Sequence, residues 1–213
     1  MLIVGGSFIN CQVHRKSSRD VKVRKEKNME SLNCLNLQKL GVFFDENSEI
    51  LHKSRYHREG FRTHCLLVIG NMLEQYEAGK VSEEALVAAC LHDIAKPRTA
   101  ALNKRHEACF YGHENVTVEE VAEFLDPDYP GFDKVLGLIR GHMLPLGIKE
   151  NTPEPFRSRN QERLRDLLDR YDEQFEKDLM ILSDCDNRAS VKSDDDLPSA
   201  EAKAELIGKK LLR

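Results

Sequence analysis

The sequence has no long apolar run, no CxxC pair and no excess of positive charge, and each absence excludes a class of protein. No run approaches the roughly 18 apolar residues of a membrane-spanning helix. The six cysteines form no CxxC pair, which excludes a zinc ribbon and a thioredoxin-type motif. The 213 residues hold 32 Lys and Arg against 36 Asp and Glu, a net charge of -4. This balance argues against a protein that coats nucleic acid along its length.

Signals for secretion and for a phosphate-binding glycine loop are also missing. The opening MLIVGGSFI is apolar but lacks the positive segment of a signal peptide. Gly5 and Gly6 are not followed by GxxxxGK. Cys90 lies in an apolar helical stretch, so we expect reduced thiols, mostly in the core, and a cytoplasmic protein without membrane contact.

The first residues differ in charge from the rest of the chain. Residues 14–27 hold seven Lys or Arg and two acids, whereas residues 1–13 carry no charge. We therefore expect residues 1–28 to be a basic leader or arm without a fixed fold, and residues 29–213 to form a single helical domain. The basic segment 14–27 is either an arm that holds RNA or another polyanion, or a poorly ordered leader upstream of a start at Met29.

Apolar residues beyond this segment recur at the spacing of helices. Ser82 suits the N-cap of a helix whose body, ALVAACLHDIA, is apolar nearly all round, as in a buried helix. Pro97 disfavours helix at Lys96 and should end it there, which leaves His92 and Asp93 in its last turns. No strand alternation follows residue 45, and further helical stripes are expected over 113–125, 132–143, 161–186 and 198–211. The prediction is an all-α fold.

Several histidines and aspartates fall on or beside the core-facing sides of these helices. A lone histidine is more often a surface or core residue than a ligand, but burying several such groups together is costly unless something binds them. A divalent metal would do so, and imidazole and carboxylate suit Mn, Fe, Co, Ni, Zn or Mg without choosing among them. The candidate ligands, for one or two ions, are His64, His92, Asp93, His113, His142 and Asp186.

Such a metal site predicts hydrolytic chemistry. A divalent metal lowers the pKa of a bound water, so that hydroxide forms near neutral pH, and it neutralises charge on a phosphoryl oxygen. Two metals about 3.5–4 Å apart can share a bridging carboxylate. Asp93, which directly follows His92, is the candidate bridge.

The order of these residues resembles the HD-domain metal-dependent phosphohydrolases, whose skeleton is H…HD…D. The matching segments run in order over about 57–190: FRTHCLLVIGNML, LHDIAKP, FYGHENV, IRGHM and LSDCDNRAS. FYGHENV is similar to the HD region of bacterial tRNA nucleotidyltransferases, the CCA-adding enzymes. Because the stretch before residue 57 is too short for their nucleotidyltransferase head, we expect a chain that does not add CCA. Two residues depart from the family pattern: Cys65 stands where Thr usually follows the first histidine, and Ala95 stands where Gly usually follows the HD pair by two positions. The resemblance implies a helical HD-domain bundle with an inward-facing His/Asp metal site.

The resemblance also implies how the ligands are shared. A first metal would be held by His64, His92, Asp93 and a late aspartate. A second would be held by His113 and His142, with Asp93 as the bridge. The late aspartate is Asp186 by alignment and by the helical stripe, with Asp184 as the alternative.

Phosphate-binding residues are expected around this set. By resemblance, Lys96 would bind a substrate phosphate oxygen, although a solvated lysine at a helix end gives the same pattern. Arg188 would do the same or brace Asp186. The stretch 143–160, rich in turn formers, is expected to be a loop. Its candidate clamps for a phosphate, or ordinary surface charges, are Lys149, Arg157 and Arg159.

The predicted function is metal-dependent phosphohydrolysis. The chain would act as a phosphomonoesterase and/or 2′,3′-cyclic phosphodiesterase on nucleotides or RNA ends, by attack of metal-bound hydroxide. One alternative is an HD fold that binds a nucleotide or RNA without turnover. Another is a different HD nucleotide hydrolase, such as a dNMP 5′-nucleotidase or a cyclic-nucleotide phosphodiesterase. The H-D-x-x-E-D pattern of ppGpp hydrolases is absent, and the sequence does not indicate the oligomeric state.

Overall fold

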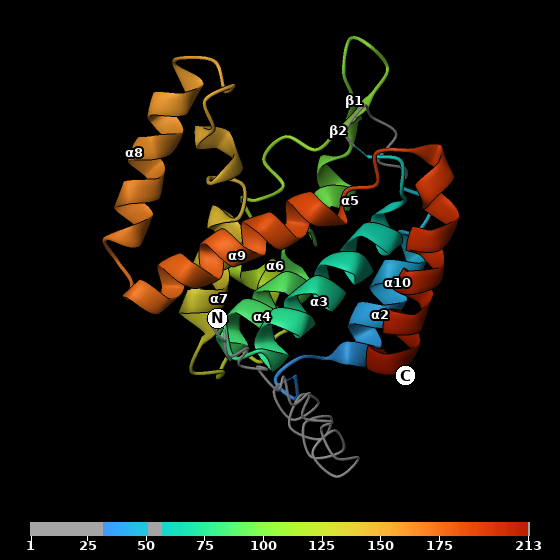
Figure 1. Cartoon of the computed structure of the whole chain (residues 1–213). Helices are drawn as coiled ribbons and strands as arrows, with labels where there is room; N and C mark the ends of the chain where they lie inside the picture. Colours follow the sequence, from blue (N-terminus) through green and yellow to red (C-terminus); the bar gives the residue numbers. More distant parts are fainter. Residues whose placement is uncertain (1–31, 51–56, 213) are drawn as a thin grey trace, which may run out of the picture.

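The computed structural model describes residues 32–50 and 57–212, so the basic segment 14–27 and the whole of the expected leader 1–28 lie outside the described residues. The described chain is a bundle of α-helices with one two-stranded hairpin (Figure 1), which confirms the predicted all-α fold. In chain order its elements are α2 Leu37–Glu46, α3 Phe61–Glu77, α4 Glu83–Leu91, α5 Lys96–Thr99, β1 Ala101–Leu102, β2 Ala108–Cys109, α6 Val118–Ala122, α7 Phe132–Gly141, the 3-10 helix η1 Leu146–Ile148, α8 Phe156–Leu168, α9 Glu173–Ala189, the 3-10 helix η2 Asp194–Asp196 and α10 Leu197–Leu211.

The helix α4 lies inside the bundle, and α3, α7 and α9 pack on it. Every residue from Ala85 to Leu91 is buried, as the nearly all-round apolar sequence predicts. The Ser82 hydroxyl accepts a hydrogen bond from the Ala85 amide and donates one to buried Asp178 of α9, 2.6 Å away, so the predicted N-cap also ties α4 to α9. None of the described helices is long and apolar enough to cross a membrane.

The end of α4 differs from the prediction. The helix stops at Leu91 and does not continue to the expected end at Lys96, and His92 is its C-cap. Tight turns follow, and Pro97 lies in the first turn of the new short helix α5, where proline is tolerated because its missing amide is not needed. Pro97 therefore begins a helix here, and the histidine–aspartate pair lies in the turn between two helices.

The stripe over 161–186 belongs to two helices and not to one. The chain turns over residues 169–172, where the Asp172 carboxylate accepts a hydrogen bond from the Phe175 amide and so caps α9. A continuous stripe of apolar residues concealed this turn, because Tyr171 keeps the spacing across it. The loop expected over 143–160 is also shorter than predicted, since α8 begins at Phe156.

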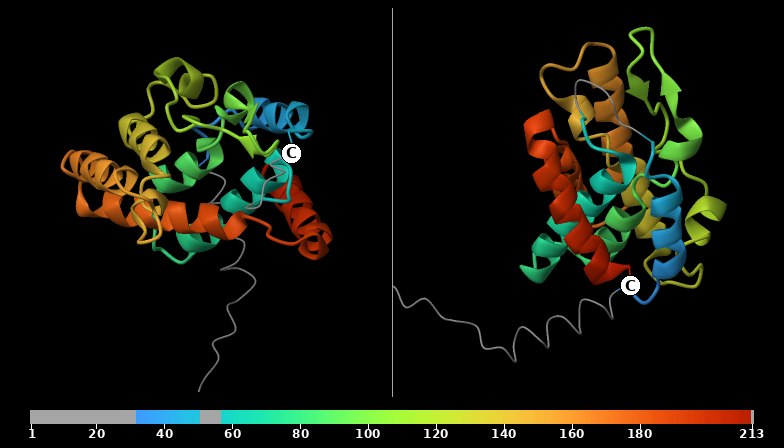
Figure 2. Two further views of the ribbon diagram at one scale, coloured as in Figure 1. Left: turned by 90° about the horizontal axis from the view of Figure 1, so that it is seen from above. Right: turned by 90° about the vertical axis from the view of Figure 1, so that its right-hand side faces the viewer.

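The hairpin of β1 and β2 was not predicted. Its strands have two residues each, too few to produce an alternating pattern. His106 adopts a positive φ of 58° in the turn between them, a conformation that few residues other than glycine accept. The hairpin projects from the same end of the molecule as the start of α8 (Figure 1 and Figure 2).

Gly141 allows α7 to pack closely in the bundle. A Cβ atom there would lie 2.5 Å from Leu167 Cδ2 and 3.1 Å from Leu179 Cδ1. The close packing of α7 against α8 and α9 therefore requires a residue without a side chain, and it sets the position of His142, the next residue.

Candidate metal centre

Four buried residues from four helices meet inside the bundle. His64 lies in α3 and Asp186 in α9, whereas His92 and His142 are the C-caps of α4 and α7. Asp93 follows His92, and His113 joins them from the segment after β2; all six side chains are buried. The structure thus brings together all six candidate ligands that the sequence suggested.

Three of the histidines are oriented by the same backbone hydrogen bond. In each, Nδ1 lies 2.6–2.9 Å from the carbonyl oxygen of the residue three positions earlier. A carbonyl oxygen only accepts, so Nδ1 carries the hydrogen, and in the neutral imidazole Nε2 keeps its lone pair. The three pairs are His92 with Ala89, His113 with Phe110 and His142 with Ile139.

Asp93 lies between two groups of histidines. Its Oδ2 atom is 3.2 Å from His92 Nε2 and 3.5 Å from His64 Nε2. Its Oδ1 atom is 3.3 Å from His113 Nε2 and 4.0 Å from His142 Nε2. One carboxylate oxygen therefore faces each group, as a carboxylate shared by two metals would.

Lone pairs face each other across this cluster, which is the arrangement that a cation satisfies. The Nε2 atoms of His113 and His142 lie 3.2 Å apart, and in the neutral imidazoles neither carries a hydrogen. His92 Nε2 and both carboxylate oxygens of Asp93 are buried without a hydrogen bond of good geometry. Such groups are costly to bury alone. The residues therefore fit one or two divalent metals, with His64, His92 and Asp186 on one side of Asp93 and His113 and His142 on the other.

The electrostatics of the cluster favour ligands without protons. Burial, reinforced by His113, lowers the pKa of His142 to about 3, which keeps this imidazole neutral. Burial alone would raise the pKa of Asp93, but the neighbouring His92 and Lys96 outweigh it and hold that pKa well below its usual range. The Lys96 ammonium lies 2.6 Å from Asp93 Oδ2, and the charges of Asp93 and Asp186 raise the pKa of Lys96 despite its burial.

His64 is the exception, because it is held between two carboxylates. Its Nδ1 lies 3.1 Å from Glu59 Oε1 and its Nε2 lies 2.9 Å from Asp186 Oδ1. Burial and Lys96 oppose protonation, but these two hydrogen bonds outweigh them and raise the pKa of His64 to about 9. Without a metal, both nitrogens of His64 therefore carry a hydrogen at neutral pH.

Metal affinity should consequently rise with pH. Below about pH 9, a metal that binds His64 Nε2 must displace its proton, so the apparent affinity should fall roughly tenfold per pH unit for each proton released. Calorimetric titration of Co²⁺ at pH 6.5, 7.5 and 8.5, in two buffers of different ionisation enthalpy, measures both the affinity and the number of protons. An affinity that is constant across this range would contradict the account.

Sequence reasoning missed Glu59, which is fully buried beside the cluster. Its Oε1 atom contacts His57 Nδ1 at 2.7 Å as well as His64, and its Oε2 atom accepts hydrogen bonds from the amides of Arg58 and Val191. A carboxylate in this position fixes the orientation of a metal-binding histidine and raises its basicity. Because Glu59 precedes α3, no helical periodicity marks it; the only signal is an acid between two histidines, in HREGFRTH.

The Glu59→Gln variant should weaken metal binding without abolishing it. The amide keeps the size of the side chain but removes the charge that stabilises the His64 ligand, so affinity for Co²⁺ should fall by about 10- to 100-fold. Competition with a chromogenic chelator gives the value, and Gln174→Ala, a change in α9 that does not touch the cluster, is the control. Equal affinities in Glu59→Gln and the unaltered protein would show that Glu59 does not act on His64.

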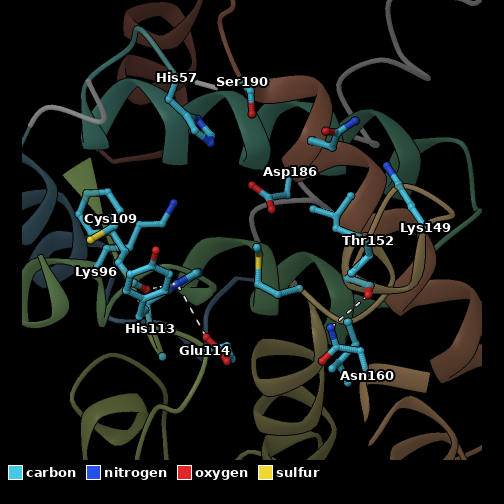
Figure 3. Close-up of a pocket in the computed structure, with 18 of the residues that line it drawn as sticks. His57, Lys96, Cys109, His113, Glu114, Lys149, Thr152, Asn160, Asp186 and Ser190 are labelled. Atoms are coloured by element: carbon cyan, nitrogen blue, oxygen red, sulfur yellow. Dashed lines mark hydrogen bonds and ion pairs between the residues drawn. The ribbon is translucent and has the colours of Figure 1, made fainter. Parts of the chain in front are cut away.

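The cluster opens into a cavity of about 800 Å³. Lys96, His113 and Asp186 line it, and Figure 3 shows Lys149 on the opposite side of the hollow from Lys96 and His113, with Asp186 between them. The wall includes polar side chains that sequence reasoning missed, among them Arg140, Asn160, Arg163, Asn187 and Lys192. They are spread over three elements and the loops between them, so no local motif reveals them.

The other predicted phosphate-binding residues lie elsewhere. Arg157 and Arg159 belong to α8 and do not line this cavity, and Arg157 is paired with Glu154 at 2.8 Å. Arg188 also lies outside the cavity lining and forms an exposed ion pair with Asp184 at 2.9 Å. Asp184 and Arg188 thus lie on the solvent side of α9.

One comparison with known proteins identifies a family for this chain. A sequence model of the HD domain matches residues 61–190, which hold all six residues of the cluster. No curated protein and no solved structure matches the chain.

Proposed function

The chain belongs to the HD domain family, and we propose that it is a metal-dependent phosphohydrolase that acts on nucleotides or RNA ends. The proposed reactions are hydrolysis of phosphomonoesters and of 2′,3′-cyclic phosphodiesters. The observation that carries the proposal is Asp93, whose two buried oxygens each face a separate group of histidines. This is the ligand arrangement of a centre in which two metals share a carboxylate.

The metals supply the part of the chemistry that no side chain here provides. When bound, divalent ions lower the pKa of a water and neutralise charge on the phosphoryl oxygens. The residues of the chain would hold and orient them: His64, His92 and Asp186 on one side, His113 and His142 on the other, with Asp93 between.

Lys96 is proposed to bind the phosphate itself. Its ammonium is nearly buried, lines the cavity and lies 2.6 Å from Asp93 Oδ2. Bound metals would take over the charge of Asp93, so that the ammonium can turn to a phosphoryl oxygen and stabilise the charge that develops there. Lys149, on the opposite wall, is proposed to contact a more distant part of the substrate.

The proposed RNA or nucleotide substrate rests on two supports. FYGHENV is similar to the HD region of CCA-adding enzymes, which act on RNA ends. The cavity is large enough for a nucleotide and combines cations with amide side chains, which suits phosphate together with a base or sugar. The basic segment 14–27 is proposed as a further RNA contact.

A panel of substrates tests the proposal. Purified protein would be assayed with 2′,3′-cyclic AMP, 3′,5′-cyclic AMP, nucleoside monophosphates, dNTPs and an aryl phosphate ester, each with Mg²⁺, Mn²⁺, Co²⁺ and Ni²⁺. We expect turnover that disappears on chelation and is greatest with a 2′,3′-cyclic nucleotide or a monophosphate. Absence of turnover with every metal, together with tight nucleotide binding, would overturn it in favour of a binding module.

A further inference from the structure

We propose that the β1–β2 hairpin and Tyr111 form a subsite for the nucleotide adjacent to the one whose phosphate reaches the metal cluster. The preferred substrate would then be the end of a single-stranded polynucleotide and not a free mononucleotide. This inference rests on the proposed function, whose site it extends.

The hairpin carries a second hollow that adjoins the main cavity. This hollow has a volume of about 470 Å³ and includes the hairpin residues Leu102, Lys104 and Arg105 in its lining. Three further residues line both hollows, namely Asn103, Glu107 and Tyr111. A chain-like ligand can therefore run from the cluster, past Tyr111, to the tip of the hairpin.

Two large apolar side chains face this second hollow and are open to solvent. Tyr111 is 81% exposed and Leu102 is 69% exposed. Tyr111 lies two residues before His113 of the cluster. An exposed aromatic ring beside a phosphate site is the arrangement that stacks a nucleobase, and such stacking accepts any base because every base has a π-face.

The tip of the hairpin holds two cations in a fixed turn. The Asn103 side-chain oxygen accepts hydrogen bonds from the amides of Arg105 and Glu107, at 2.8 and 3.0 Å. The Asn103 amide group also donates to Glu107 Oε2 at 3.0 Å, which engages the acid nearest to the tip. The side chains of Lys104 and Arg105 are thus exposed on a preformed turn, as phosphate contacts require.

The sites follow one another in the order of a nucleotide chain. The metal cluster and Lys96 suit a phosphate, Tyr111 suits a base, and Lys104 and Arg105 suit the next two phosphates. A mononucleotide would leave the last of these sites without a partner, whereas a strand of several nucleotides would use all three.

Binding of a labelled hexanucleotide to the full chain tests the subsite. The strand ends in a 3′-hydroxyl, the product of phosphate removal, so that no turnover interferes, and fluorescence anisotropy gives the affinity. Tyr111→Ala should weaken binding by about tenfold or more, whereas Tyr111→Phe, which keeps the ring, should not. RNA and DNA hexamers are compared; an RNA preference would indicate that the 2′-hydroxyl is also recognised.

The role of Lys104 and Arg105 is tested through the salt dependence of hexanucleotide binding. Changing both Lys104 and Arg105 to alanine should reduce the slope of log K against log salt by about 1.4, the value for two phosphates of a single strand. Changing both Lys177 and Lys209 to alanine, two exposed lysines that line neither hollow, is the matched control and should leave the slope unchanged.

The outcomes separate the subsite from the proposed function. If Tyr111→Ala and the hairpin variant bind the hexamer as the unaltered protein does, the subsite is overturned, whatever the hydrolysis panel gives. If both variants bind more weakly but no phosphate ester in any substrate is hydrolysed, the subsite stands and the phosphohydrolase proposal fails.

Discussion

The Asp93→Asn variant should lose phosphate release by about a thousandfold or more and should bind divalent metal much more weakly. Asp93 is the carboxylate that faces both histidine groups, through Oδ2 to His92 and His64 and through Oδ1 to His113. Asparagine keeps the shape but has no negative charge and only one oxygen. The stabilisation of transition-state charge that metals supply is several kcal/mol, and each 1.4 kcal/mol corresponds to a factor of ten in rate.

Asp178→Asn is the matched control for this variant. Asp178 is also a buried aspartate, but its partners are Ser82 and Gln174 and it does not contact the cluster. Its loss should lower the melting temperature and leave metal content and specific activity near the original values. If Asp93→Asn retains both metal and activity while it remains folded by circular dichroism, the bridging role is wrong.

The second large effect is expected for Asp186→Asn and not for Asp184→Asn, although the two aspartates lie only two residues apart. Asp186→Asn removes the carboxylate whose Oδ1 lies 2.9 Å from His64 Nε2 and 3.9 Å from His92 Nε2, so metal affinity and phosphate release should each fall by about a hundredfold or more. Asp184→Asn breaks only the exposed pair with Arg188, and such pairs contribute at most about 1 kcal/mol. It should leave both quantities unchanged.

Calorimetric metal titration and a phosphate-release assay on the two variants decide between these positions. Because Asp186 is buried and Asp184 is exposed, the melting temperature of each variant is measured beside its activity. A result in which Asp184→Asn loses activity and Asp186→Asn keeps it would mean that the late aspartate has been assigned to the wrong side of α9.

Much of the fold could be predicted from the sequence because helical periodicity and capping are local signals. The all-round apolar body of α4 and its cap at Ser82 occur as predicted. The end of α4 and the division of α8 from α9 were missed, because a tight turn after Leu91 and a turn over residues 169–172 both preserve the spacing of the apolar residues. The hairpin was too short to leave a pattern.

The candidate ligands could be inferred from sequence because each falls on or near a core-facing stripe or a motif. Their partners could not, since Glu59 reaches His64 from outside any helix and Asp93 contacts residues on three other segments. The predicted phosphate-binding arginines show that a residue can also be assigned to the site wrongly from sequence. Arg157 and Arg159 were chosen because their stretch looked like a loop, whereas the structure has them on α8 outside the cavity.

The most direct measurement is a metal titration of chelated protein in which bound metal and phosphate release are followed in the same samples. We expect no activity after chelation, tight binding of one or two Mn²⁺ or Co²⁺ ions per chain, and activity that rises in step with occupancy. The Asp93→Asn variant should show neither the binding nor the recovery of activity. Phosphate release that is unchanged by complete removal of metal, or a chain that binds no divalent ion, would contradict the metal-dependent centre.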